Sequence, residues 1–205
     1  MLAFVAGIFF GVNMAGVYEA AKAFEKLLNT EYIFVVARKG VEAKIHLLFQ
    51  KQHFYHIAGL HYLIDIQSLR GDRTVIFEKI LKKQIEADIK KSNFYNKIAN
   101  RVELLLQLQN ILDSNDTVFH YDETYNSFSA IKAEYLLENR ILDKNVFLFL
   151  DKNIDGKYFC RSFFPQDWKD YTKGQQKWTV LYKEKIISGQ TEVLYRHKNF
   201  YKAID

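Results

Sequence analysis

The chain has 205 residues, of which 49% are hydrophobic and 26% charged, so it is long enough to bury a core of its own. Its single proline, its nine glycines and the absence of a Ser/Pro-rich linker argue against two loosely tethered domains. The one cysteine, Cys160, cannot form an intramolecular disulfide, which excludes a disulfide scaffold and favours a reducing, cytoplasmic compartment. The net charge of +5 is unevenly distributed and is concentrated in the last quarter of the chain.

The amino terminus carries no charge through residue 17. A signal peptide would begin with basic residues, and this apolar run is short for a membrane span. Three interpretations stay open: translation that starts at Met14, a helix packed on the core, or a short membrane anchor. From residue 18 the sequence predicts one domain that reaches residue 190, followed by a basic tail over residues 191–205.

The first half of the domain mixes a hairpin with helices. Residues 18–29 predict a helix with one apolar side, and two β-rich runs around a turn at Lys39-Gly40 predict a hairpin over residues 32–49. Residues 53–64 are expected to be helical, and two long helices are expected over residues 74–91 and 93–113. The second of these carries an apolar stripe at helical spacing, made of Phe94, Ile98, Val102, Leu105 and Leu112.

The second half of the domain has strand-like runs. They begin near residues 118, 131, 146, 158 and 177, and residues 151–156 have the composition of a hairpin turn between two of them. We therefore expect an α+β fold in which helices pack on a mainly antiparallel sheet of four to five strands, with an N-terminal β-hairpin and a helical insertion.

Three of the six histidines, His53, His56 and His61, fall within nine residues and lie among aromatic residues. Histidine titrates nearest to neutral pH, so such a cluster indicates acid–base chemistry or metal binding. The spacing lacks the His-Glu-x-x-His pattern, and no second ligand cluster follows it, so the metal interpretation is the less favoured one. No nucleophile elbow or phosphate-binding glycine loop occurs either.

The basic excess lies in residues 152–202, which hold eleven Lys/Arg against five Asp/Glu, with aromatic residues interspersed. Cations neutralise phosphates and aromatic rings stack on bases, so this region suits single-stranded RNA. Strand alternation from residue 177 predicts that Lys177, Thr179 and Lys183 form a row on one side. A solvated basic face over an aromatic core is the alternative.

Two stretches carry a resemblance to a known family. Residues 49–61, preceded by the hairpin, and the closing residues 161–165, 170–174 and 177–185 resemble the fourth phage-borne subgroup of the barnase–EndoU–colicin–RelE-like (BECR) nucleases. The resemblance implies a BECR-like helix-plus-sheet fold and a metal-independent ribonuclease without a cofactor. Such proteins are toxins or effectors of phages and other mobile elements in bacteria. An antitoxin or immunity protein is the partner that this implies.

Cleavage of RNA through its own 2′-hydroxyl needs a base, an acid and fixed cations on the phosphate. His56 and His61 are the candidates for base and acid, and Arg161, Ser162 and Thr179 are candidates for holding the phosphate. Further contacts to RNA are expected from Lys177, Lys183, Arg70, Arg73 and Tyr182. A non-catalytic module that binds nucleic acid or an acidic protein through the basic and aromatic residues, with structural histidines, stays open as the alternative.

Overall fold

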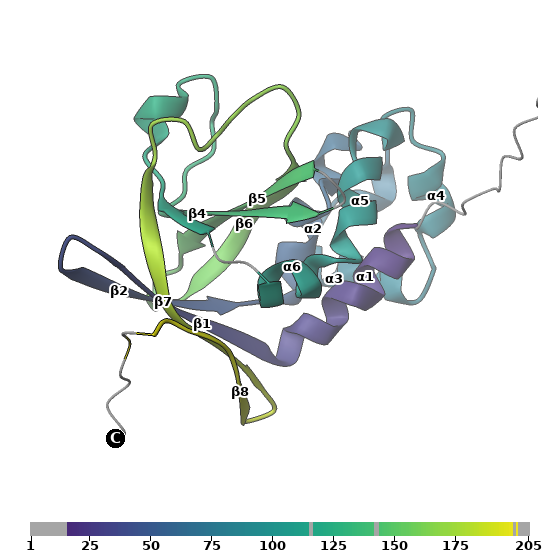
Figure 1. Ribbon diagram of the computed structural model, residues 1–205. Coiled ribbons are helices and arrows are strands. Elements are labelled where there is room, and N and C mark those ends of the chain that lie inside the picture. Colours follow the sequence, from purple (N-terminus) through teal and green to yellow (C-terminus); the bar gives the residue numbers. More distant parts are fainter. Residues whose placement is uncertain (1–15, 115–116, 142–143, 199, 201–205) are drawn as a thin grey trace, which may run out of the picture.

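The computed structural model describes residues 16–114, 117–141, 144–198 and 200 (Figure 1). The uncharged segment 1–17 lies outside this range except for its last two residues, and the suggested start at Met14 lies outside it as well. Across the described ranges, no helix has both the length and the apolar character needed to cross a membrane.

Eight strands form one sheet in the described part of the chain. They are β1 (Thr30–Arg38), β2 (Val41–Leu48), β3 (Thr117–His120), β4 (Tyr135–Ile141), β5 (Lys144–Lys152), β6 (Tyr158–Pro165), β7 (Gln176–Ile187) and β8 (Gln190–Arg196). Their hydrogen-bonded order is β1-β2-β6-β5-β4-β3-β7-β8, and β1 pairs with β7 in addition. The first seven strands of this order therefore close into a mixed barrel, and β8 is attached outside it.

The expected α+β fold, with helices packed on a mainly antiparallel sheet of four to five strands, is wrong. The N-terminal hairpin is part of the barrel, because β1 pairs antiparallel with β2 along one edge and with β7 along the other. A single parallel bridge, between Leu47 and Tyr158, joins β2 to β6. Strand β8 occupies residues that were predicted to form a tail. Closure removes the free edges that an open sheet of the same strands would expose.

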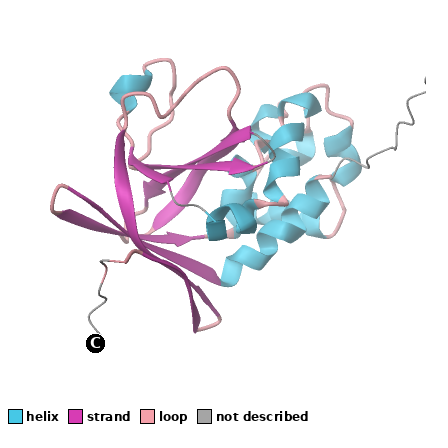
Figure 2. Cartoon of the chain, in the orientation of Figure 1, coloured by secondary structure: helices cyan, strands magenta, loops and turns pink. Residues whose placement is uncertain are grey.

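The α-helices gather on one side of the barrel (Figure 2). They are α1 (Val17–Glu25), α2 (Phe54–Ile57), α3 (Arg73–Leu81), α4 (Glu86–Lys90), α5 (Ala99–Leu105) and α6 (Leu108–Ser114). The two long helices predicted over residues 74–91 and 93–113 are each interrupted. Lys83 adopts a left-handed backbone between α3 and α4. Between α5 and α6, the amides of Leu106 and Gln107 bond carbonyls three residues back, so the α-helical pattern is broken there.

Two apolar clusters fill the structure. The larger cluster joins the buried faces of the helices to the barrel strands and includes Phe24, Phe54 and Phe77. The smaller cluster lies on the opposite faces of β3, β4 and β5, where alternate side chains point the other way, and includes Phe147, Phe149 and Tyr171. Of the predicted stripe, Ile98, Val102, Leu105 and Leu112 are confirmed as buried core, and Phe94 is partly buried against it.

Candidate active site

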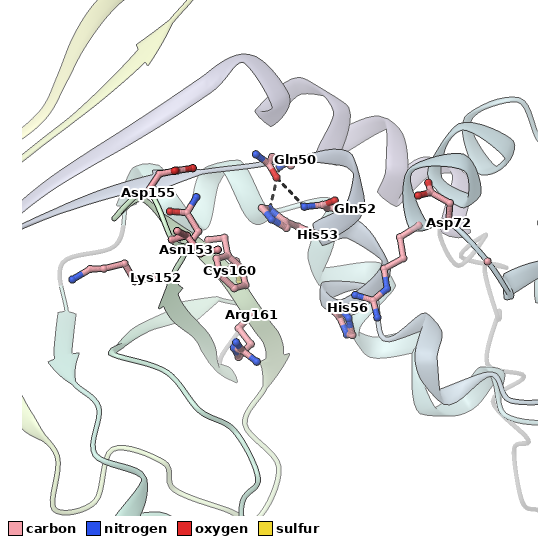
Figure 3. Close-up of a pocket in the computed structure, with 14 residues that line it drawn as sticks. Gln50, Gln52, His53, His56, Asp72, Lys152, Asn153, Asp155, Cys160 and Arg161 are labelled. Atoms are coloured by element: carbon pink, nitrogen blue, oxygen red, sulfur yellow. Dashed lines mark hydrogen bonds between the residues drawn. The ribbon is translucent and has the colours of Figure 1, made fainter.

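A cavity of about 860 Å³ opens between the helical segment that follows β2 and the β5–β6 hairpin (Figure 3). The helical side contributes the side chains or backbone of Gln50, Gln52, His53, His56, Gly71, Asp72 and Arg73. The strand side contributes Lys152, Asn153, Ile154, Asp155, Phe159, Cys160 and Arg161. Two of the three predicted histidines and two of the predicted arginines therefore meet at one place.

His56 reaches the cavity because of how the one-turn helix α2 packs. Phe54 and Ile57 are fully buried, which turns the intervening Tyr55 and His56 toward the outer side of the helix. Gly59 then ends the segment with a φ of 76°, a left-handed conformation that favours glycine.

Arg161 faces the cavity because of a β-bulge. Leu150 pairs with Cys160 and Phe149 pairs with Ser162, so Arg161 is an extra residue on β6 without a pairing partner on β5. Bulges redirect side chains and occur often beside active sites. The Arg161 guanidinium bonds Asp151 at 2.5 Å and lies over the Phe159 ring at 5.6 Å. Figure 3 shows it on the strand side of the cavity, with His56 on the helical side.

Arg73 brings a second cation to the cavity. It is the first residue of α3, and the preceding Asp72 caps that helix by accepting a hydrogen bond from the Val75 amide at 2.9 Å. The Arg73 guanidinium lies 5.4 Å from the centre of the Tyr55 ring. Two arginines from separate elements therefore line the same cavity as the His56 imidazole.

The electrostatics keep His56 neutral. Partial burial lowers its pKa below the ordinary histidine value, and the positive charges of Arg73 and Arg161 lower the pKa further. A neutral imidazole at neutral pH is able to accept a proton, and the two guanidinium groups are cations. The arrangement thus combines a proton acceptor with two fixed cations.

His53 has a structural role on the wall of the cavity. Its ring stacks on Phe159 with centroids 5.1 Å apart, and its Nδ1 accepts a hydrogen bond from the Gln50 amide at 3.1 Å. Burial lowers the pKa of His53 to about 4, and the repulsion that would arise if His53 and His56 were both protonated contributes. The neutral ring therefore carries its proton on Nε2.

His61 lies behind His56 and is not part of the cavity lining. The two ring centroids are 5.3 Å apart, and part of the His61 side chain is exposed. Burial of the rest of the ring lowers the pKa of His61 to about 4, and repulsion from a protonated His56 and from Arg101 and Arg73 contributes. The two predicted histidines are therefore adjacent, but only His56 lines the cavity.

Cys160 also borders the cavity, but its side chain is buried. The thiol donates a weak hydrogen bond to the Ser162 carbonyl at 3.4 Å, and burial raises the pKa of Cys160 to about 12. A thiol with such a pKa is protonated at neutral pH, so the environment of Cys160 is that of a buried structural residue.

The other predicted residues are not assembled at the cavity. Ser162 follows the bulge on β6, and Arg70 is exposed in the loop before α3. Thr179 lies on β7 between Ala37 of β1 and Thr117 of β3, and Lys177 donates a hydrogen bond to the Thr117 hydroxyl at 3.4 Å. These β7 residues do not line the cavity.

The predicted row of Lys177, Thr179 and Lys183 does not exist. Val35 of β1 pairs with Tyr182 and Val36 pairs with Val180, so Leu181 is a bulge and the alternation of β7 reverses there. Lys183 points inward and is only 2% exposed, and its Nζ donates hydrogen bonds to the carbonyls of Leu112 and Asp113 at the end of α6. Tyr182 is equally buried, so neither side chain offers a surface to RNA.

We expect Lys183→Met to lower the free energy of unfolding by about 1–3 kcal/mol, because two carbonyls at the end of α6 lose their donor. Lys177→Met, at an exposed position of the same strand, is the matched control and is expected to change it by less than about 0.5 kcal/mol. Urea unfolding measures both values. An unchanged stability of Lys183→Met with weakened RNA binding would restore Lys183 to the binding surface.

Sequence reasoning missed three parts of this site. Arg101 of α5 lies close to His61, although nothing in its local pattern distinguishes it from other helical cations. Phe159 forms the stacking wall, and the β5–β6 turn contributes Asn153 and Asp155 to the rim. That turn was identified from its composition, but its position opposite His56 depends on barrel closure. Within the described ranges, no three His, Cys, Asp or Glu side chains come together as a metal site requires.

A family model described as phage-Barnase-EndoU-ColicinE5/D-RelE like nuclease4, PBECR4, matches residues 16–200. The chain belongs to this family. The suspected relationship to the phage-borne BECR nucleases is thereby confirmed, and it covers the barrel, the helices and the cavity together. No match was found among curated proteins or among solved structures.

Membership of PBECR4 makes a nucleic acid the expected substrate, which agrees with a cavity that contains two arginines beside a neutral histidine. The family relationship supports nuclease activity in general. The assignment of individual residues depends on the geometry described above.

Proposed function

We propose that this PBECR4 protein is a metal-independent endoribonuclease that cleaves mRNA or tRNA, and that it acts as a toxin or effector of a phage or another mobile element. The observation that carries the proposal is the presence of His56, Arg73 and Arg161 in one cavity, with both arginines close enough to lower the pKa of His56. This set can supply the proton acceptor and the phosphate-binding cations of RNA cleavage from protein side chains alone.

In the proposed reaction, neutral His56 takes the proton of the 2′-hydroxyl, and the 2′-oxygen attacks the adjacent phosphorus. The bond between phosphorus and the 5′-oxygen breaks, and the departing oxygen takes a proton from the imidazolium form of His61. The products are a 2′,3′-cyclic phosphate and a 5′-hydroxyl, and the two histidines have exchanged their protonation states.

Arg73 and Arg161 have a different role, that of fixed cations. Held on α3 and on the β6 bulge, they are positioned to bind the phosphate oxygens and to stabilise the charge that builds up during attack. A bound phosphodiester also offsets their effect on the histidines, because its negative charge raises the pKa of a nearby imidazole. Substrate binding therefore favours the protonated His61 that the leaving group needs.

A toxin of this kind needs a neutralising partner in the cell that makes it. An acidic antitoxin or immunity protein would match the positive charge of the cavity and would place carboxylates where the phosphates of RNA bind. The cytoplasm, where mRNA and tRNA occur, is the proposed site of action.

Incubation of the purified protein with total tRNA and a structured mRNA in EDTA tests the proposed activity. We expect cleavage to persist in EDTA and to leave 2′,3′-cyclic phosphate ends. A deoxyribose at the cleaved position should block the reaction, since it removes the nucleophile. Cleavage that disappears in EDTA would contradict the metal-independent mechanism, and RNA that is bound but uncut would favour the non-catalytic module.

The lowered pKa values predict an acidic pH optimum. The reaction requires neutral His56 and protonated His61, and the protonated form of His61 is lost as the pH rises through its lowered pKa. We therefore expect kcat/KM to be highest below about pH 6.5, the ordinary histidine pKa, and to fall on the basic side. For His61→Ala we expect a much lower kcat/KM, and a pH profile that no longer falls on the basic side. An optimum well above neutrality would contradict the assignment of His61 as the acid.

A further inference from the structure

Arg101 is a half-buried cation close to the candidate active site. It extends from α5, and its guanidinium carbon lies 5.2 Å from the centre of the Tyr62 ring and 5.0 Å from the centre of the Phe164 ring. A long hydrogen bond of 3.5 Å joins it to the Tyr62 hydroxyl. Two aromatic rings thus hold the planar guanidinium in a defined place.

The side chain passes close over Gly59. A Cβ built at Gly59 would lie 3.1 Å from the Arg101 Cδ and 3.3 Å from the Tyr62 ring. The glycine that ends the His56 segment therefore also gives the arginine room to approach it. This contact ties the position of Arg101 to the backbone that carries His56.

Arg101 has no carboxylate partner among the residues that the structure describes, and its only polar side-chain contact there is with Tyr62. Arg161, by contrast, pairs with Asp151. Burial lowers the pKa of the Arg101 guanidinium, because loss of water disfavours a charge that no anion offsets. Part of the side chain is still exposed, so an anion from solution can reach it.

A continuous series of ring contacts connects Arg101 to the proposed cleavage site. The His56 and His61 centroids are 5.3 Å apart, the His61 and Tyr62 centroids are 4.1 Å apart, and Arg101 lies over Tyr62. An anion bound at Arg101 would therefore be a neighbour of the group bound at His56, on the His61 side of the cavity.

We infer that Arg101, held between Tyr62 and Phe164, binds an uncleaved phosphate of the RNA substrate, the one that neighbours the cleaved phosphate in the same strand. The inference depends on the proposed ribonuclease function, and it extends the binding site from the cavity of His56 to α5. Phosphate groups are regularly spaced along RNA. A desolvated arginine without an acidic partner beside the cleavage site is therefore suited to bind the phosphate adjacent to the cleaved one.

Substrate length tests this inference. A dinucleoside monophosphate holds only the cleaved phosphate, whereas an octanucleotide with the same cleaved step also holds its neighbours. Arg101→Met keeps the aliphatic stem and removes the charge. We expect it to lower kcat/KM on the octanucleotide by about tenfold more than on the dinucleotide, the size of a lost charge-assisted hydrogen bond. Lys97→Met removes another cation, one that lies over Phe94 away from these contacts, and is the matched control.

A binding measurement separates this inference from the proposed function. With a fully 2′-O-methylated octanucleotide, which cannot be cut, the slope of log K against log salt should become shallower by about 0.7 for Arg101→Met and stay unchanged for Lys97→Met. If the wild type cuts no RNA, the proposed function fails, and this slope still decides whether Arg101 binds phosphate.

Two results would overturn the inference. Equal losses of kcat/KM on both substrates would make Arg101 a positioning residue for the histidines, and unchanged values on both, with an unchanged slope, would remove it from the site. Urea unfolding checks the fold of each variant. Should Arg101→Met fail to fold, Arg101→Lys replaces it. Lysine keeps the charge without the planar fork, so it should weaken octanucleotide binding while preserving the slope.

Discussion

His56→Gln is expected to lower the rate of RNA cleavage by about 10²–10⁴-fold, the usual contribution of a general base. Glutamine keeps much of the size and polarity of the imidazole but cannot take up a proton at neutral pH. Arg73 and Arg161 are unchanged in this variant, so RNA should still bind with an affinity within about threefold of wild type, as expected when a group acts mainly in the transition state. Single-turnover cleavage in EDTA and fluorescence anisotropy with an uncut RNA measure the two quantities.

His120→Gln is the matched control for this substitution. His120 ends β3, is exposed, and is not part of the cavity lining, so its replacement should leave cleavage unchanged. If His56→Gln cleaved at the wild-type rate, His56 would be a structural residue of α2. A parallel loss of cleavage and of RNA affinity would instead indicate a binding contact, as the non-catalytic module requires.

Local patterns in the sequence predicted much of the secondary structure and two residues that line the candidate site. The hairpin of β1 and β2 was predicted from a turn at Lys39-Gly40, and both residues adopt the positive φ that such a turn requires. The β5–β6 turn was predicted in the same way, and Gly156 has a φ of 77° there. His56 and Arg161 were selected because of their side-chain chemistry, and the fold brings them to one cavity.

Long-range pairing was not predictable from those patterns. Periodicity shows that β1 and β7 are strands, but it does not show that they pair, and that pairing closes the barrel. Bulges have no clear local signal either. The bulge at Leu181 turns Lys183 into the core, so a lysine that was expected on the surface became a hydrogen-bond donor to the end of α6. One inserted residue changed the role of every position after it.

The bulge on β6 has the opposite consequence, because it places Arg161 at the cavity. Regular alternation would pair residue 161 with β5, whereas the bulge leaves it as an extra residue between two paired neighbours. Arg101 illustrates a third kind of limit to local prediction. Its environment distinguishes it, because two aromatic rings and no acidic side chain among the described residues surround it. Both rings are distant from Arg101 in sequence and come close to it only when the chain folds.

Arg161→Met is expected to reduce cleavage by about 10²–10³-fold, the range seen when one group that stabilises a developing oxyanion is removed. The substitution keeps the aliphatic stem over Phe159 and removes the cation nearest to His56 on the strand side. Its ion pair with Asp151 is about half exposed, and such pairs contribute about 1 kcal/mol or less, so the fold should tolerate the change. Single-turnover rates and urea unfolding measure the two effects.

Asp151→Asn separates catalysis by Arg161 from its ion pair. This variant removes the same pair from the other side and leaves the Arg161 charge in place, so it should lose as little stability as Arg161→Met. Since the guanidinium is then released from a competing carboxylate, cleavage should be retained to within about tenfold, the loss expected from poorer positioning alone. If Asp151→Asn instead lost as much activity as Arg161→Met, the activity would depend on the intact Arg161–Asp151 ion pair. The charge of Arg161 alone would then not account for phosphate binding.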